Sequence, residues 1–297
     1  MGQQMSKSFL ARLPLAASAV DRDYLGRESV DDLLADPATR FLVLHDGKAL
    51  LASPTSLALV EQVEHAETLI YLGRSLEHGT PLFAAVVDEH EGEFGNLRTL
   101  GGSLSPLHAT LFAEALAMAN WHRATRFSPL SGAATTSSKG GWVLLDSETD
   151  AELFPRTDMA IIVGVTDADD RLLLGSNAQW ESNRYSLLAG FVEPGESLEA
   201  AVLREVFEES GIRVTDPRYL GSQPWPFPAS LMLGFLARVD ETVVSTLTPD
   251  GLEILDLRWF SRAELHAALG EIMLPGPTSI ARAIIEEWYG GPVEVAP

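Results

Sequence analysis

The sequence predicts an α/β (α+β) fold, in which strands and helices are interleaved along the chain. Short apolar runs bounded by turn-forming residues alternate with segments of helical periodicity, which is typical of mixed folds. The composition, with 46% hydrophobic and 21% charged residues, is that of a globular protein. The chain has 297 residues, enough for one large domain or two, because domains usually hold about 100–200 residues.

The first 125 residues predict a small α+β domain. Apolar runs at 41–44, 69–73 and 83–87 predict buried strands, and Asp46-Gly47 after the first run predicts a hairpin turn. Residues 108–125 are rich in Ala and Leu at helical spacing, which predicts a helix of about four to five turns.

Residues 126–157 predict a connector between two domains. The polar stretch 128–141 is rich in Ser, Thr, Gly and Ala, which indicates a loop or linker. The apolar runs 142–145 and 152–154 then predict a short hairpin. We therefore expect an N-terminal domain at 1–125, the connector at 126–157 and a C-terminal domain at 158–297.

The C-terminal domain begins with a strand–turn–strand pattern over 159–174. A glycine-containing loop from 190 leads into a helix, which Ser197 can cap at its N-terminus and Gly211 can end. Strands follow at 231–239 and 255–260. Two further helices are expected at 261–269 and 279–289.

The charge balance and the lack of cysteine exclude several roles. With 21 Lys+Arg against 42 Asp+Glu, the net charge of −21 disfavours wrapping of duplex nucleic acid or binding to an anionic membrane. No apolar run approaches the roughly 18–20 residues of a membrane span, so no membrane partner is expected. Zero cysteine excludes disulfides, a thiol nucleophile and cysteine-ligated zinc. An acidic enzyme can still bind phosphates if metal ions mediate the contact.

The expected helix near 198–210 carries an unusual set of acids. Glu205, Glu208 and Glu209 are spaced i, i+3 and i+4, so they project from one face, where like charges repel. Clustered carboxylates are the ligands that Mg²⁺ requires, although a solvated acidic face is the plainer alternative. Arg204 can pair with Glu208 one turn on or reach back to Glu196.

A second motif follows the helix at 222–230, Ser-Gln-Pro-Trp-Pro-Phe-Pro-Ala-Ser. Its prolines fix φ and would hold Trp225 and Phe227 in place, where they could stack on planar rings with little loss of entropy. Taken alone, the run is more typical of a rigid proline-rich loop.

Both motifs together resemble a known family. The Nudix box matches at every defining position: Gly190, Glu196, Arg204, Glu205, Val206, Glu208, Glu209, Gly211 and Ile212. The proline-rich run is similar to the signature of the NADH pyrophosphatase subfamily. This resemblance implies a C-terminal Nudix α/β/α sandwich with a mixed sheet, preceded by a smaller α+β Nudix-like domain.

The resemblance also implies an activity and its residues. The expected reaction is hydrolysis of the pyrophosphate of NAD(H) to nicotinamide mononucleotide and AMP, with two or more Mg²⁺ or Mn²⁺ ions, in a cytoplasmic homodimer. The implied metal ligands are Glu205, Glu208, Glu209, Glu253 and the carbonyl of Ala189, and Arg204 joins the three box glutamates as catalytic residues. The implied dinucleotide-binding positions are Gln223, Pro224, Trp225, Pro226, Phe227, Pro228, Ala229, Ser230, Phe191, Phe154, Arg98 and Ala281.

Relatives often carry a four-cysteine zinc ribbon between the two domains. The matching positions here are Ser128, Ser131, Asp146 and Thr149, and none of the seven histidines lies between them. Because hydroxyls are far poorer zinc ligands than thiolates, we expect a connector without zinc, held by packing of Trp142, Leu144 and Phe154.

Several functions remain open at this point. Removal of NAD caps from RNA 5′ ends uses the same chemistry, a broader ADP-ribose or dinucleotide hydrolase is a third possibility, and a non-catalytic nucleotide sensor is a fourth. The retained acids disfavour the sensor. The general base is expected to be Glu208, with Glu253 as the alternative if it does not bind metal.

Overall fold

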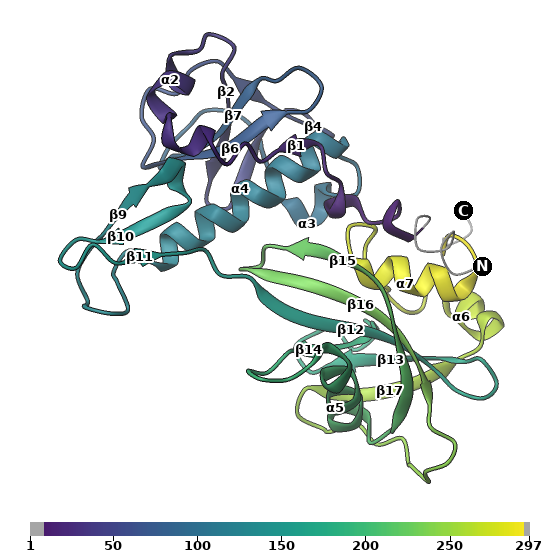
Figure 1. The fold of residues 1–297 in the computed structure, drawn as a ribbon. Helices are drawn as coiled ribbons and strands as arrows, with labels where there is room; N and C mark the ends of the chain where they lie inside the picture. The colour runs from purple at the N-terminus through teal and green to yellow at the C-terminus, as the bar shows by residue number, and fades with distance from the viewer. Residues whose placement is uncertain (1–8, 294–297) are drawn as a thin grey trace. The chain divides into compact units, whose positions relative to one another are not determined.

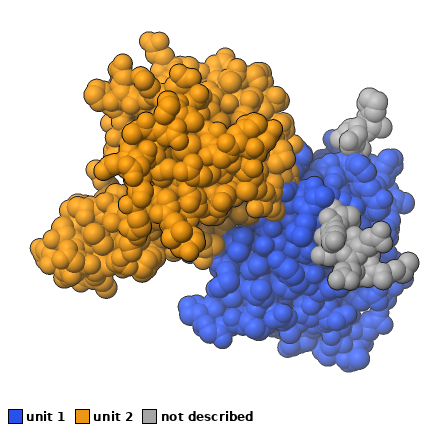
Figure 2. Space-filling model, turned by 45° about the horizontal axis from the view of Figure 1, so that its top comes forward, with its two compact units in different colours: residues 1–13, 158–223, 231–297 blue, residues 14–157, 224–230 orange. Residues whose placement is uncertain are grey.

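The computed structural model describes residues 9–293, which belong to two compact units (Figure 2). The C-terminal unit comprises residues 1–13, 158–223 and 231–297, and the N-terminal unit comprises residues 14–157 and 224–230. The loop 224–230 therefore belongs to the N-terminal unit, although the strands on either side of it lie in the C-terminal unit. The separate connector at 126–157 stays a prediction.

The N-terminal unit is built on a mixed sheet of order β1-β6-β7-β2-β3-β4, with β5 paired to β2 and β8 to β3 (Figure 1). Its strands are β1 (Val20–Asp21), β2 (Arg40–His45), β3 (Lys48–Ser53), β4 (Ser56–Leu57), β5 (Leu59–Val60), β6 (Thr68–Ser75), β7 (Pro81–Val86) and β8 (Phe94–Gly95). Its helices are α2 (Val30–Ala35), α3 (Leu97–Leu100) and α4 (Pro106–Ala124), with short 3₁₀ turns at Pro14–Ala16 and Gly26–Glu28.

The predicted strands and helix of this unit are confirmed. The Asp46-Gly47 turn joins β2 to β3, and both of its residues have positive φ. Helix α4 begins after Ser105, whose Oγ accepts a hydrogen bond from the backbone N–H of His108 at 3.3 Å. Alternate residues of the sheet, such as Leu42 and Ile70, pack with α4 in one core, while the opposite face packs against α2.

The connector forms its own three-stranded antiparallel sheet of β9 (Thr135–Ser138), β10 (Val143–Asp146) and β11 (Glu152–Leu153). The prediction of a continuous loop at 128–141 is wrong for β9 and the 3₁₀ turn Lys139–Gly141, because pairing with β10 imposes a strand on polar residues. The prediction that Phe154 packs is also wrong, since it is 63% exposed. Trp142 packs as expected, and its Nε1 donates to the Tyr71 carbonyl at 2.7 Å.

The C-terminal unit contains a sheet of order β15-β16-β12-β13-β17, with β14 paired to β12. Its strands are β12 (Asp158–Thr166), β13 (Leu172–Asn177), β14 (Leu188–Phe191), β15 (Val214–Trp225), β16 (Ser230–Val239) and β17 (Ile254–Phe260), and its helices are α5 (Leu198–Ser210), α6 (Arg262–Ala268) and α7 (Ile280–Tyr289). The strands and helices predicted here are confirmed.

Helices α5 and α7 cover opposite faces of this sheet (Figure 1). Ile161 and Val163 of β12 pack with Val202 and Val206 of α5. Gly164, which points to the other face, lies against Ile284 of α7. This alternation gives the predicted α/β/α sandwich, because successive residues of a strand face opposite sides of a sheet. Within residues 9–293, no helix is both long and apolar enough to cross a membrane.

Candidate active site

Helix α5 begins and ends where the sequence predicts. The Ser197 Oγ accepts a hydrogen bond from the Ala200 N–H at 3.2 Å, and Gly211 adopts a left-handed conformation with φ of 69° at the C-terminal end. These local signals fix the helical register of the Nudix box, so Glu205 and Glu209 point toward the sheet while Glu208 remains half exposed.

Arg204 connects the acids of the box. Both pairings left open by the sequence are present, since its guanidinium makes two 2.8 Å hydrogen bonds to Glu196 and a 3.0 Å bond to Glu208. Its Nη1 also lies 2.9 Å from Glu205, and its Nη2 donates to the Phe191 carbonyl at 3.0 Å. The hydrogen bonds from Arg204 lower the pKa of Glu196 to about 2, which keeps this carboxylate charged.

Gly190 makes room for the carboxylate of Glu205. Gly190 of β14 pairs with Ile161 of β12, and a Cβ at Gly190 would lie 2.0 Å from the Glu205 carboxyl carbon. Burial raises the pKa of Glu205, opposed by Arg204 and assisted by the charges of Glu208 and Glu253. The glycine of the Nudix box is therefore required by contact with an acid fifteen residues later in the sequence.

Glu209 is the most deeply buried acid of the group, with 6% of the residue exposed. Burial and, to a lesser extent, the charges of Glu205, Glu253 and Asp250 together raise its pKa to about 8, against a hydrogen bond from the backbone of Ala189. Its Oε2 is buried without a hydrogen-bond partner. A buried acceptor without a donor is unusual in a folded protein and indicates a ligand or ion at this position.

Glu253 is positioned by a turn ahead of β17. The Oδ1 of Asp250 accepts hydrogen bonds from the backbone N–H groups of Leu252, Glu253 and Ile254 at 2.9–3.1 Å. The Glu253 carbonyl in turn accepts a 2.7 Å hydrogen bond from the Ala178 N–H. Asp250 was not predicted from the sequence, although an Asp-Gly pair three residues before Glu253 is a turn signal that could have identified it.

The donor set fits a hard divalent cation. Glu205 and Glu253 lie close enough to Glu209 to raise its pKa, and the Oε2 of Glu209 is buried without a hydrogen-bond partner. Carboxylate oxygens are the ligands that such cations prefer. In the conformation described for residues 9–293, no three His, Cys, Asp or Glu side chains are already gathered as a metal cage. In this arrangement Glu205 and Glu208 are both paired with Arg204.

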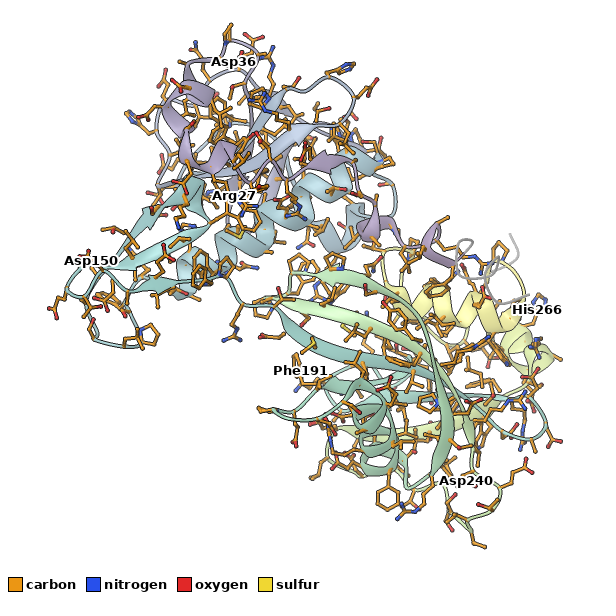
Figure 3. All side chains as sticks on the ribbon, in the orientation of Figure 1. Arg27, Asp36, Asp150, Phe191, Asp240 and His266 are labelled. Atoms are coloured by element: carbon orange, nitrogen blue, oxygen red, sulfur yellow. The ribbon has the colours of Figure 1, made fainter. Side chains whose placement is uncertain are left out.

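Three predicted substrate positions lie elsewhere in the C-terminal unit. Phe191 is 59% exposed at the end of β14, and Figure 3 shows it projecting from that strand. Gln223 is fully buried, and its Nε2 donates to the Thr278 carbonyl at 2.9 Å, which links β15 to the segment before α7. Ala281 is also buried, in the first turn of α7. Of these three side chains, only Phe191 is freely accessible to a ligand.

The remaining predicted substrate positions lie in the N-terminal unit. Arg98 lies over two aromatic rings of the proline-rich loop, with its guanidinium carbon 3.9 Å from the Phe227 centroid and 5.1 Å from that of Trp225. The two rings meet edge to face at 4.9 Å. The Asn120 side chain contacts the same loop and was missed, although an Asn in an otherwise apolar stretch of α4 is a signal.

The four ribbon positions converge on the carboxylate of Asp146. Ser131 Oγ donates to Asp146 Oδ2 at 2.6 Å, and the N–H groups of Glu148 and Thr149 donate to Oδ1 at 2.9 and 3.1 Å. Hydrogen bonds from Ser128 and Ser131 lower the pKa of Asp146 below its usual range. The expectation of no zinc stays a prediction, and this hydrogen-bond network supports it.

Comparison with known proteins shows the family of the chain. The sequence matches the NUDIX domain over residues 155–276 and the NADH pyrophosphatase-like rudimentary NUDIX domain over residues 38–121. A protein of Mycobacterium bovis (strain BCG / Pasteur 1173P2) described as "NAD-capped RNA hydrolase NudC" is 41% identical over 273 residues, which cover 86% of this chain and 85% of that protein. The chain belongs to the Nudix hydrolase family. Its N-terminal match places this Nudix hydrolase with the NADH pyrophosphatases.

Two further similar proteins cover smaller shares of the chain. A Pseudomonas syringae pv. syringae (strain B728a) protein of the same description is 37% identical over 211 residues, covering 70% of this chain and 68% of that protein. A crystal structure of a NUDIX hydrolase from Nitrosomonas europaea is 18% identical, with a TM-score of 0.43, over 57% of this chain and 96% of the other.

Proposed function

We propose that this Nudix hydrolase cleaves the pyrophosphate of NAD(H), or of a dinucleotide like it, to nicotinamide mononucleotide and AMP with bound Mg²⁺ or Mn²⁺. The observation that carries the proposal is the buried Glu209 carboxylate, which has one oxygen without a partner and stands beside Glu205 and Glu253. Such a group of acids is costly in an apolar setting unless cations bind it, and cations also let an acidic protein approach an anionic pyrophosphate.

Glu205, Glu209 and Glu253, with the backbone of Ala189, would hold the cations. When bound, they would neutralise the pyrophosphate and make a water molecule more acidic. Glu208 is exposed enough to accept the proton from that water, and Arg204 holds its carboxylate at 3.0 Å. Arg204 also fixes Glu196 and the carbonyl of Phe191, so the loop before α5 is held in one position relative to the acids.

The substrate class is supported by the aromatic groups and by the relatives. Trp225 and Phe227 offer planar faces within a loop whose prolines restrict its backbone, and Phe191 is an exposed ring at the end of β14. The relatives are described as NAD-capped RNA hydrolases, which favours NAD-capped RNA as a second candidate substrate. ADP-ribose or another dinucleotide is the broader alternative, and we propose a cytoplasmic homodimer on the resemblance alone.

Product analysis on four substrates tests the proposal. NADH, NAD⁺, ADP-ribose and NAD-capped RNA are incubated side by side with Mg²⁺ or Mn²⁺, with a Glu209→Gln variant and a chelator as controls. AMP and the reduced mononucleotide from NADH would support NAD(H) as the substrate, and a higher kcat/KM on capped RNA would favour the second candidate. Cleavage of ADP-ribose alone would overturn both.

A further inference from the structure

The loop between β15 and β16 is held by the N-terminal unit. Residues 224–230 group with 14–157, whereas the preceding strand residues up to Gln223 and those from Leu231 group with the C-terminal unit (Figure 2). Trp225 and Phe227 pack against the core that α4 and the N-terminal sheet form. The Nudix-like domain, which lacks the acidic box, therefore contributes structure to the part of the chain that carries the aromatic groups.

Asn120 of α4 makes the polar contacts to this loop. Its Nδ2 donates to the carbonyl of Pro226 at 3.0 Å and to that of Pro228 at 3.1 Å. Arg123, one turn further along α4, donates to Asn120 Oδ1 at 3.1 Å. Because an arginine can only donate, this contact fixes the amide orientation and directs both N–H bonds at the loop.

The loop 224–230, which contains the turn between the paired strands β15 and β16, has few backbone donors of its own. Three of its seven residues are prolines, which lack a backbone N–H, so they cannot donate to a neighbouring strand. Within residues 224–230, the Phe227 N–H reaches the Trp225 carbonyl at 2.7 Å. Asn120 supplies a side-chain donor to the carbonyls of both Pro226 and Pro228.

We propose that Asn120 is a positioning residue for dinucleotide binding, through which the Nudix-like N-terminal domain sets the place of Trp225 and Phe227. Arg98, which precedes α4 in the sequence, lies over the same two rings. Asn120 touches no reacting atom, so its contribution is to binding and not to the chemical step. This inference rests on the proposed function, because the loop matters only if the substrate carries a ring to stack on it.

The test compares Asn120→Asp with the wild-type protein. Aspartate has the shape of asparagine and keeps the contact to Arg123, but it cannot donate to Pro226 and Pro228 when ionised. We expect KM for NADH to rise about tenfold while kcat stays within about twofold, because two hydrogen bonds are lost from a group that acts in binding. Asn183→Asp is the matched control, since Asn183 Nδ2 also donates to a carbonyl, that of Glu271 at 3.3 Å.

Amide hydrogen exchange gives a second readout that does not depend on activity. In Asn120→Asp the N–H groups of Phe227 and Ala229 should exchange at least about tenfold faster, and those of α5 should not change. Unchanged exchange in the loop would overturn the proposal, as would faster exchange with a wild-type KM. A fall in kcat with unchanged KM would indicate a merely structural role and would overturn it too. If the wild type cleaves no NADH, the proposed function fails, and the exchange data still decide whether Asn120 holds the loop.

Discussion

Replacement of Gly190 by alanine should lower the activity of the protein with little change in its stability. The Cβ of an alanine would stand 2.0 Å from the Glu205 carboxyl carbon, whereas real Cβ contacts essentially never fall below 3.0 Å. The carboxylate must therefore retreat by about 1 Å or more. Gly190 has no positive φ, so alanine fits the backbone of β14, and the three atoms nearest to its Cβ all belong to the Glu205 carboxylate.

The cost of this displacement differs between folding and catalysis. The Glu205 carboxylate is the end of a flexible side chain, so moving it should cost about 1 kcal/mol of unfolding free energy, at the low end for overpacking. A ligand or catalytic group misplaced by about 1 Å can cost about 100-fold in rate. We therefore expect kcat/KM to fall about 100-fold with little change in stability.

The assay measures kcat/KM on NADH and the urea midpoint for both variants of a matched pair. Gly291→Ala is the control, because a Cβ at Gly291 meets no atom within 4 Å and its φ is not positive. In a Glu205→Gln background, Gly190→Ala should cost little further activity, since the group it displaces is already impaired. A Gly190→Ala protein with wild-type kcat/KM would refute the reasoning.

Three further predictions concern the acids of the Nudix box, the buried Glu114 and the hydrogen-bond network of Asp146. Glu208→Gln and Glu209→Gln should each lower kcat by about 100-fold or more, and near-normal NADH cleavage by both variants would contradict the assignment. Burial raises the pKa of Glu114 to about 7 from 4.5 despite Arg22 at 2.6 Å, so its protonated form favours folding. The unfolding free energy should fall by about 3 kcal/mol as pH rises from 4.5 past 7, and Glu114→Gln should remove this slope in urea titrations. Metal analysis of the purified protein should find no stoichiometric zinc, and one zinc per chain would contradict this expectation. Asp146→Ala should lower the melting temperature more than Ser131→Ala does.

The local part of the site follows from the sequence. Capping at Ser197, the left-handed Gly211 and the spacing of the acids between them depend on contacts within a single helix, so periodicity and turn chemistry suffice to predict them. The two pairings of Arg204 were both foreseen because Glu196 and Glu208 lie within eight residues of it. The alternation of β12 between two helical layers follows in the same way from the period of a strand.

The long-range part could not be predicted in this way. Asn120 and Pro226 are separated by 106 residues, and no local pattern indicates that they meet. Residues 135–138 are polar and have weak strand signals, so their strand depends on pairing with β10. Phe154 was expected to pack because it is large and apolar, but single exposed apolar side chains are common on protein surfaces.

The hydrogen-bond network around Asp146 implies that a chelator should not unfold this part of the protein. In a zinc ribbon, metal binding and folding are one event, so removal of the ion unfolds the domain. Here Asp146 receives its partners from Ser131 and from the backbone of the following turn, and these donors are present whatever the metal supply. Loss of cations should then silence the acidic site reversibly while the fold persists. The protein should remain folded without metal ions, and its activity should return when Mg²⁺ or Mn²⁺ is added.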